Sequence, residues 1–157
     1  MAEKDWYPEM SNWLKRYLVD KYKGYEVIVT YETAVQKLDV VLMKYGIDCP
    51  MAKGLDIEVD IIGILKRKNL YKLVFMEVKD VPLKLTHLGQ LWGYCQLINP
   101  EEAFLISPRG LGTLGKCLVD LRRIDILQYG ENHINKSMKV VKWDPTSKSL
   151  DYTTLVE

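Results

Sequence analysis

The chain contains few of the residues that build zinc centres or disulfide frameworks. It has three cysteines and two histidines in 157 residues, and no two cysteines form a C-x-x-C pair. This usage argues against a zinc site and favours reduced, structural thiols in an intracellular, cytoplasmic protein. The sequence also lacks an apolar run of about 18 residues that could span a membrane. Its first ten residues lack the apolar core of a signal peptide, so we expect no membrane partner.

A strong net charge is absent as well. The 22 basic and 21 acidic residues leave a formal charge of +1, so the whole chain has no general attraction for nucleic acid, although a local basic patch can supply one. We find no internal repeat and no low-complexity segment. The hydrophobic fraction of 48% and the charged fraction of 27% are ordinary for a globular protein. We therefore expect a single domain over residues 1–157.

The most informative stretch is residues 56–80, in which two apolar runs flank a polar cluster. The β-branched and aromatic content of both runs predicts strands joined by a tight turn. If that turn is centred on the Lys-Asn pair of the cluster, paired positions sum to 137, and Asp60 lies directly opposite Glu77. Both faces of these strands are otherwise apolar, with Val59 and Ile61 expected on the same face. Such strands are typical of the centre of a sheet.

The acidic face of this hairpin has a specific chemical meaning. Because side chains alternate along a strand, Glu58, Asp60, Glu77 and Lys79 share one face. Two opposed acids repel each other, and burial increases the penalty. A hard cation such as Mg²⁺ between them reverses that penalty, and Lys79 could orient a water and stabilise negative charge. The alternative is a strand end with solvated acids and a surface ion pair between Glu58 and Lys79.

The arrangement of Asp60 on one strand and Glu77-Val78-Lys79 on the next resembles the PD-(D/E)XK nuclease superfamily, with VDIIG and LVFMEVKD as context. The resemblance implies a restriction-endonuclease-like fold and a nuclease that hydrolyses phosphodiester bonds in DNA. It also implies that Asp60, Glu77 and the Val78 carbonyl hold Mg²⁺, with Mn²⁺ as a substitute. Lys79 would then align the attacking water.

The helix expected after this motif carries a second part of the resemblance. His87, Gln90 and Tyr94 lie on one helix face. The Gln90-x-x-x-Tyr94 spacing is similar to the Q-x-x-x-Y element of the RecB-like branch, which implies that Gln90 supports the catalytic site and that Tyr94 positions substrate. A polar face with one core tyrosine is the alternative. The archaeal Holliday-junction-resolvase-like branch is a second resemblance, and it leaves a homodimer open because branched-DNA resolvases are dimers.

Three more residues are candidates by their position. Lys53, in the loop that leads into the hairpin, and Lys84, at the start of the next helix, could contact the nucleic-acid backbone. For Lys53 the alternative is a solvated loop lysine. Glu9 stands near the start of the first helix, where some members of the superfamily carry an extra acid that joins the metal site. A carboxylate there is also favourable to the helix dipole.

The remaining pattern predicts an α/β fold. We expect a central mixed sheet of four or five strands, flanked by helices, and a peripheral C-terminal β-hairpin. Strand, helix and strand in succession after the motif predict a parallel crossover. The expected helices span residues 7–23, 35–45, 83–98 and 111–123, and the expected strands outside the hairpin span 26–32, 101–107, 124–129, 138–143 and 150–156.

Two other functions fit the same pattern. One is a non-catalytic nucleic-acid-binding or assembly module that retains the nuclease fold, which the near-neutral charge favours and the intact acid pair disfavours. The other is an α/β interaction protein without a metal site. A response of protein stability to Mg²⁺ or Mn²⁺ distinguishes the nuclease from both.

Overall fold

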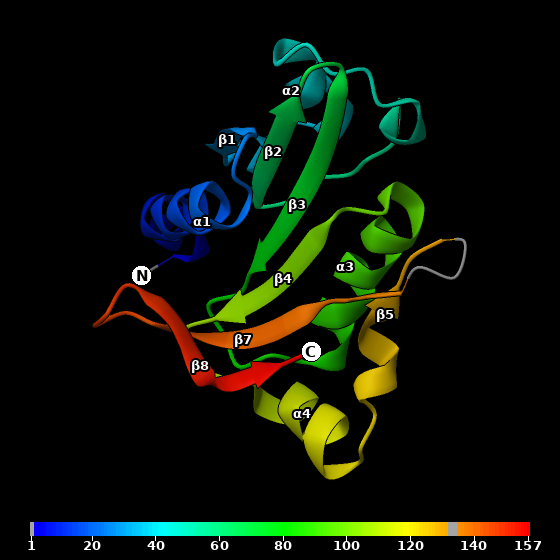
Figure 1. Ribbon diagram of the computed structural model, residues 1–157. Coiled ribbons are helices and arrows are strands. Elements are labelled where there is room, and N and C mark those ends of the chain that lie inside the picture. The colour runs from blue at the N-terminus through cyan, green and yellow to red at the C-terminus, as the bar shows by residue number, and fades with distance from the viewer. Residues whose placement is uncertain (1, 132–134) are drawn as a thin grey trace.

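The computed structural model describes residues 2–131 and 135–157, and its centre is a mixed six-stranded sheet in the order β1-β2-β3-β4-β7-β8 (Figure 1). Its strands are β1 (Glu26–Thr30), β2 (Ile61–Arg67), β3 (Leu70–Val78), β4 (Glu102–Ser107), β7 (Lys139–Asp144) and β8 (Ser149–Val156). The middle strands β3, β4 and β7 are parallel to one another, and the other pairs are antiparallel. The α/β class and the parallel arrangement of β3 and β4 are confirmed, whereas the expected strand number was too low.

The central hairpin has the register that the sequence predicts. The ladder between β2 and β3 runs from Ile61 opposite Met76 to Arg67 opposite Leu70, so paired positions sum to 137. Its turn is made possible by Lys68, whose φ of 57° is in the left-handed region. One detail differs, because Val59 packs in the cluster on the other side of the sheet from Ile61. Regular alternation stops where β2 begins, since the chain before Ile61 is not part of the ladder.

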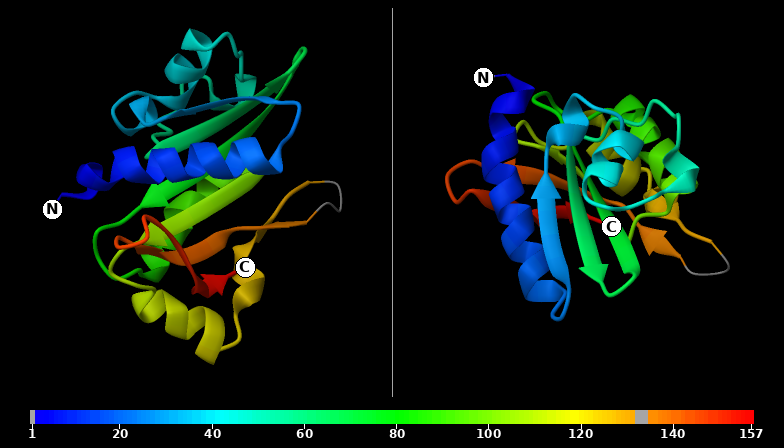
Figure 2. Two further views of the ribbon diagram at one scale, coloured as in Figure 1. Left: turned by 60° about the vertical axis from the view of Figure 1, so that its left-hand side comes forward. Right: turned by 90° about the horizontal axis from the view of Figure 1, so that it is seen from above.

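Helix α1 (Tyr7–Lys21) covers one face of the sheet and follows a short 3₁₀ turn, η1 (Glu3–Trp6) (Figure 2). Its apolar stripe packs on alternate residues of the central strands in one buried cluster. Close approach of this helix requires a glycine at position 63, because a Cβ there would lie 2.6 Å from Leu18 Cδ1. The glycine in β2 thus fixes how near α1 lies to the sheet, and with it where Tyr7 stands.

The other face is covered by α2 (Leu38–Lys44), α3 (Leu85–Ile98) and α4 (Gly112–Gly115), which continues into a π-helical turn at Lys116–Asp120. A second buried cluster joins these helices to the sheet. The helix expected at 35–45 is shorter, because residues 35–37 form a turn and a bend between the 3₁₀ turn Glu32–Ala34 and α2. Within the described residues no helix is long and apolar enough to cross a membrane.

The C-terminal third differs most from the expectation. Its hairpin of β7 and β8 is not peripheral: β7 pairs in parallel with β4, and Trp143 is fully buried. Residues Ile124–Leu127 form a 3₁₀ turn, and only Gln128–Tyr129 (β5) form a strand, which pairs with β6 (Lys136–Ser137). The composition of residues 130–137 is typical of a polar loop, but the last two belong to β6, and residues 132–134 lie outside the described part.

Candidate active site

Asp60 lies just before β2 and Glu77 near the end of β3, and Tyr7 at the start of α1 contacts Asp60. The backbone N–H of Asp60 donates to Glu77 Oε1 at 3.2 Å, and the backbone N–H of Val78 donates to Asp60 Oδ2 at 2.8 Å. Each carboxylate is therefore held by the backbone of the opposite strand. Glu77 is only 2% exposed, which rules out a solvated strand end for this residue.

The charges at this edge are unbalanced in favour of negative charge. Burial and the neighbouring Asp60 carboxylate raise the pKa of Glu77 well above its ordinary value, while Lys79 acts in the opposite direction. The Lys79 Nζ atom is 3.8 Å from Glu77 Oε2. Glu58 is exposed and forms no ion pair with Lys79 in the described part of the chain. The acid pair thus has one nearby lysine and a deficit of positive charge, which a proton or a cation can fill.

Two residues from the N-terminal segment, neither of them predicted from the sequence, complete this edge. The Tyr7 hydroxyl donates to Asp60 Oδ1 at 2.7 Å, and its pKa is raised by burial and by that carboxylate. Glu3, which is half-buried, has a pKa raised by burial, lowered by the charge of Lys79 and raised by that of Asp60. Both contacts depend on how α1 crosses the sheet, so only the glycine at position 63 hints at them in the sequence.

An aspartate next to the lysine links the site to the neighbouring strand end. Asp80 Oδ1 accepts hydrogen bonds from Trp6 Nε1 and from Arg109 Nε, both at 3.1 Å. Arg109 follows β4, which lies parallel to β3, so both strands deliver side chains to the same edge of the sheet. Its backbone is held by Ser107, whose hydroxyl accepts from the Arg109 N–H and donates to the Val81 carbonyl. The Arg109 guanidinium therefore lies at this edge of the sheet and has further N–H groups that can donate hydrogen bonds.

The start of α3 also lies at this site. Lys84 caps the helix, and its backbone N–H donates to His87 Nδ1 at 3.0 Å. The pKa of His87 is lowered by burial and by the charges of Lys79 and Lys84. His87 therefore lies near both Lys79 and Lys84, and the contact of Lys84 with a nucleic acid stays a prediction.

Other candidates are not part of this cluster. Glu9 was expected as an extra acid, but its carboxylate accepts a hydrogen bond from Trp143 Nε1 at 2.7 Å, and Glu3 from the preceding turn is the acid whose charge interacts with Asp60 and Lys79. Glu9 is two residues after Tyr7 on α1, so its side chain points to a different side of the helix from the one that contacts Asp60.

Lys53 and the Gln90–Tyr94 pair also form no hydrogen bond or ion pair with the acid pair within the described residues, and their roles toward a nucleic acid stay predictions. Lys53 is exposed after a 3₁₀ turn (Pro50–Ala52) and forms no ion pair with the acids in the described segments. Gln90 and Tyr94 share a helix face, as expected, and Gln90 Nε2 donates to Tyr94 Oη at 3.3 Å. No hydrogen bond joins Gln90 to Lys79 among the residues that the structure describes, and Gln90 is exposed. Its support of the lysine stays a prediction.

The donor set of the site suits a hard divalent cation. Asp60 and Glu77 supply carboxylate oxygens that are already oriented by backbone N–H groups, and they come with no cysteine or histidine ligand. Across residues 2–131 and 135–157 no cluster of three or more acidic, cysteine or histidine side chains could hold a metal. Two carboxylates with several retained waters are compatible with Mg²⁺ and are a poor match to zinc.

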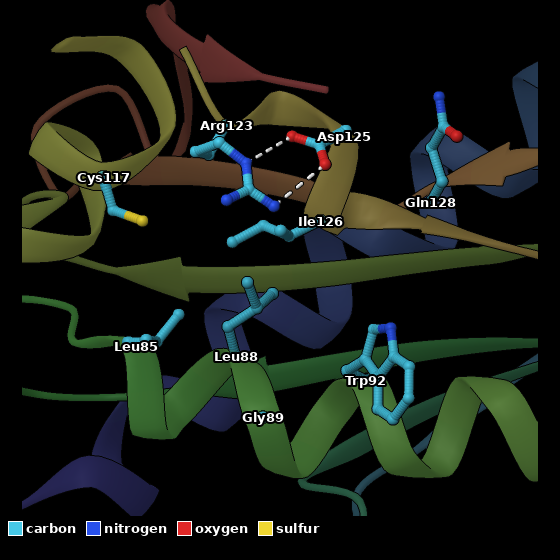
Figure 3. A pocket seen from close by; sticks show the side chains of 9 residues that line it. All are labelled: Leu85, Leu88, Gly89, Trp92, Cys117, Arg123, Asp125, Ile126 and Gln128. Atoms are coloured by element: carbon cyan, nitrogen blue, oxygen red, sulfur yellow. Dashed lines mark hydrogen bonds and ion pairs between the residues drawn. The ribbon is translucent and has the colours of Figure 1, made fainter. Parts of the chain in front are cut away.

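A separate hollow lies between α3 and the chain around residues 117–128, with a volume of about 500 Å³ (Figure 3). Its lining is mostly apolar, with Leu88 and Trp92 on α3 facing Ile126. The acid at its rim, Asp125, is already bound by Arg123 at 2.9 and 3.1 Å. The hollow shares no residue with the acid pair, so we place the chemistry at Asp60 and Glu77.

No protein-family model matches the sequence, and no curated protein matches it either. The case for this site therefore depends on its geometry.

Proposed function

We propose that the protein is a metal-dependent nuclease that hydrolyses phosphodiester bonds in DNA. The observation that supports this function best is the Asp60–Glu77 pair, two carboxylates fixed by opposite strands, one of them buried, with Lys79 beside them. Two ionised acids opposed at a sheet edge repel each other, and a cation bound between them removes that penalty while both stay ionised. The same geometry is what the resemblance to the PD-(D/E)XK superfamily implies.

Each side chain has a separate role in this proposal. Asp60, Glu77 and the Val78 carbonyl would hold Mg²⁺, which supplies a more acidic bound water and polarises the scissile phosphate. Tyr7 keeps the Asp60 carboxylate oriented through the hydrogen bond to Oδ1. Lys79 aligns the attacking water and offsets the negative charge that develops on the phosphate. Lys84 provides a cationic contact for the DNA backbone at the start of α3.

A non-catalytic nucleic-acid-binding module with the same fold is the second candidate. It is favoured by the exposed position of Gln90, which bonds Tyr94 rather than Lys79, and by the net charge of +1. In that case the acid pair would bind no cation and the protein would only hold its partner.

Cleavage assays test the proposal directly. We would incubate the protein with Mn²⁺ or Mg²⁺ and single-stranded, duplex, flap and four-way-junction DNA, with RNA beside them. We expect metal-dependent cleavage of at least one DNA, and a loss of about a thousandfold or more in Glu77→Gln, because the glutamine keeps the shape but not the charge. Glu58→Gln, at an exposed acid two residues before Asp60, is the matched control and should cleave normally.

Thermal melting in the same buffers separates the two candidates. Mn²⁺ at about 100 times its dissociation constant should stabilise the wild type by about 2.7 kcal/mol through mass action, and should leave Glu77→Gln unchanged. Stabilisation by Mn²⁺ without cleavage of any nucleic acid would support the metal site and contradict the nuclease. Absence of both effects would contradict a metal site at this edge.

A further inference from the structure

A hollow of about 690 Å³ adjoins the acid pair on the side of β1. It is lined by the 3₁₀ turn before α1, by the start of α1 and by the segment that follows β1. Tyr7 lines the hollow and also donates to Asp60, so the two sites share a wall. Thr30, the last residue of β1, pairs with Ile62, and Tyr31 therefore emerges at the same edge of the sheet as Asp60. The volume lies within the range of about 300–1,000 Å³ that is usual for ligand pockets.

The lining of this hollow suits an aromatic ring next to a phosphate. Tyr31 is 45% exposed and Val35 is 81% exposed, although both are large apolar side chains. The rings of Tyr31 and Tyr7 lie 6.0 Å apart at an angle of 47°, which forms an aromatic wall that leads to Asp60. Exposed aromatic faces are the surfaces on which bases of single-stranded nucleic acids stack.

One cation of the hollow is available to an anionic chain. Of the two acids in the lining, Glu32 pairs with Lys44 at 2.6 Å, whereas Asp5 accepts only a backbone hydrogen bond from Ala2 at 2.8 Å and keeps its charge. Lys4 lines the hollow and takes part in none of the ion pairs found in residues 2–131 and 135–157. A phosphate at the mouth of the hollow would thus meet a cation that has no competing carboxylate partner.

We propose that this hollow binds the base of a nucleotide next to the scissile phosphate, stacked on Tyr31, with Lys4 near the backbone. The inference depends on the proposed nuclease function and narrows its substrate. A base can enter the hollow only if it is unpaired or flipped out of the helix, which costs a few kcal/mol in an intact duplex. The preferred substrate is therefore DNA with an unpaired nucleotide at the cleavage position, such as a single strand or a flap.

The test combines an abasic scan with variants of Tyr31. In a single-stranded DNA of fixed sequence, each nucleotide near the cleaved bond is replaced in turn by an abasic site. We expect one position at which this lowers wild-type kcat/KM by about 5- to 100-fold, the usual weight of one stacked base. Tyr31→Ala should show a similar loss on intact DNA and no further loss on the abasic one. Tyr31→Phe should be close to wild type, and Tyr152→Ala, at an exposed tyrosine on β8, is the matched control.

A binding assay keeps this inference separate from the cleavage chemistry. Quenching of 2-aminopurine placed at the same position, measured with Glu77→Gln in Ca²⁺, should be strong and should disappear when Tyr31→Ala is added. Quenching without any cleavage by the wild type would support the base site and overturn the nuclease. Cleavage with no abasic-sensitive position, or losses from Tyr31→Ala and the abasic site that multiply, would overturn the base site and leave the nuclease standing. Circular dichroism confirms that each variant is folded.

Discussion

The two buried glutamates, Glu77 on β3 and Glu102 on β4, are 2% and 3% exposed and lie on neighbouring parallel strands, yet their surroundings are opposite. Glu102 accepts hydrogen bonds from two tyrosine hydroxyls at 2.6 and 2.5 Å and forms ion pairs with two lysines at 3.2 and 3.1 Å. These partners are Tyr17, Tyr22, Lys21 and Lys139. Glu77 instead faces another acid and has one lysine at 3.8 Å.

The pKa values of Glu77 and Glu102 are shifted in opposite directions by these surroundings. Burial acts to raise the pKa of Glu102, but its hydroxyl and ammonium partners outweigh burial and lower it below the ordinary value. Burial and Asp60 raise the pKa of Glu77. Glu102 is thus surrounded by hydroxyl and ammonium groups, whereas Glu77 has one backbone hydrogen bond and one more distant lysine. A carboxylate that the chain leaves uncompensated is the one available to a ligand.

The largest expected difference is in stability after removal of each carboxylate. Glu102→Ala leaves two lysines and two buried hydroxyls without their acceptor and should cost about 2–4 kcal/mol, below the full value for a buried pair because the Lys21 side chain is 49% exposed. Glu77→Ala removes a like-charge contact and should cost much less in metal-free buffer, or stabilise the fold. Urea unfolding with EDTA measures both. Equal losses would show that the two sites do not differ as described.

The pH dependence of stability should separate the same residues, because their pKa values shift in opposite directions on folding. Because the pKa of Glu102 is lowered from 4.5, its contribution is present above that pH and is lost as the pH falls through the folded value. Because the pKa of Glu77 is raised from 4.5, the folded protein loses stability as the pH rises from 4.5 through the folded value.

Glutamine variants provide the measurement. Glu102→Gln should be less stable than the wild type at pH 7, with a deficit that shrinks below pH 4.5. Glu77→Gln should match the wild type near pH 4 and exceed it at pH 7 without metal. Urea unfolding at a series of pH values tests both curves, and two differences of the same sign at pH 7 would contradict the assignment.

The position of the acid pair could be predicted from the sequence because two local rules determine it. A short turn with a left-handed residue at Lys68 sets the register, and the period of two then places Asp60 against Glu77. The rules end where the ladder ends, which is why Val59 was assigned to the wrong face. The order of elements likewise predicted that β3 and β4 would be parallel.

Contacts between distant segments were not predictable in this way. The hydrogen bond from Tyr7 to Asp60 spans 53 positions and depends on the crossing of α1, which the Gly63 contact controls. The sequence of the C-terminal hairpin has an ordinary strand pattern. This pattern does not indicate that β7 pairs with β4, or that the hairpin adds two strands to the main sheet. The hydrogen-bond and ion-pair partners of Glu102 come from α1, from Tyr22 directly after it and from β7, so the sequence did not predict them either.

The smallest expected effect on stability concerns two tyrosines, each of which donates a hydrogen bond to a carboxylate, one at the acid pair and one at Glu102. Tyr7 donates to Asp60 at 2.7 Å and Tyr17 donates to Glu102 at 2.6 Å. Tyr7→Phe and Tyr17→Phe each remove one hydrogen bond to a carboxylate and should each cost about 1 kcal/mol of stability. Only Tyr7→Phe should also weaken Mn²⁺ binding, by about tenfold, because it releases a carboxylate that holds the cation. Titration calorimetry with Mn²⁺ measures this, and an equal loss of affinity in both variants would show that Tyr7 acts through general stability and not through Asp60.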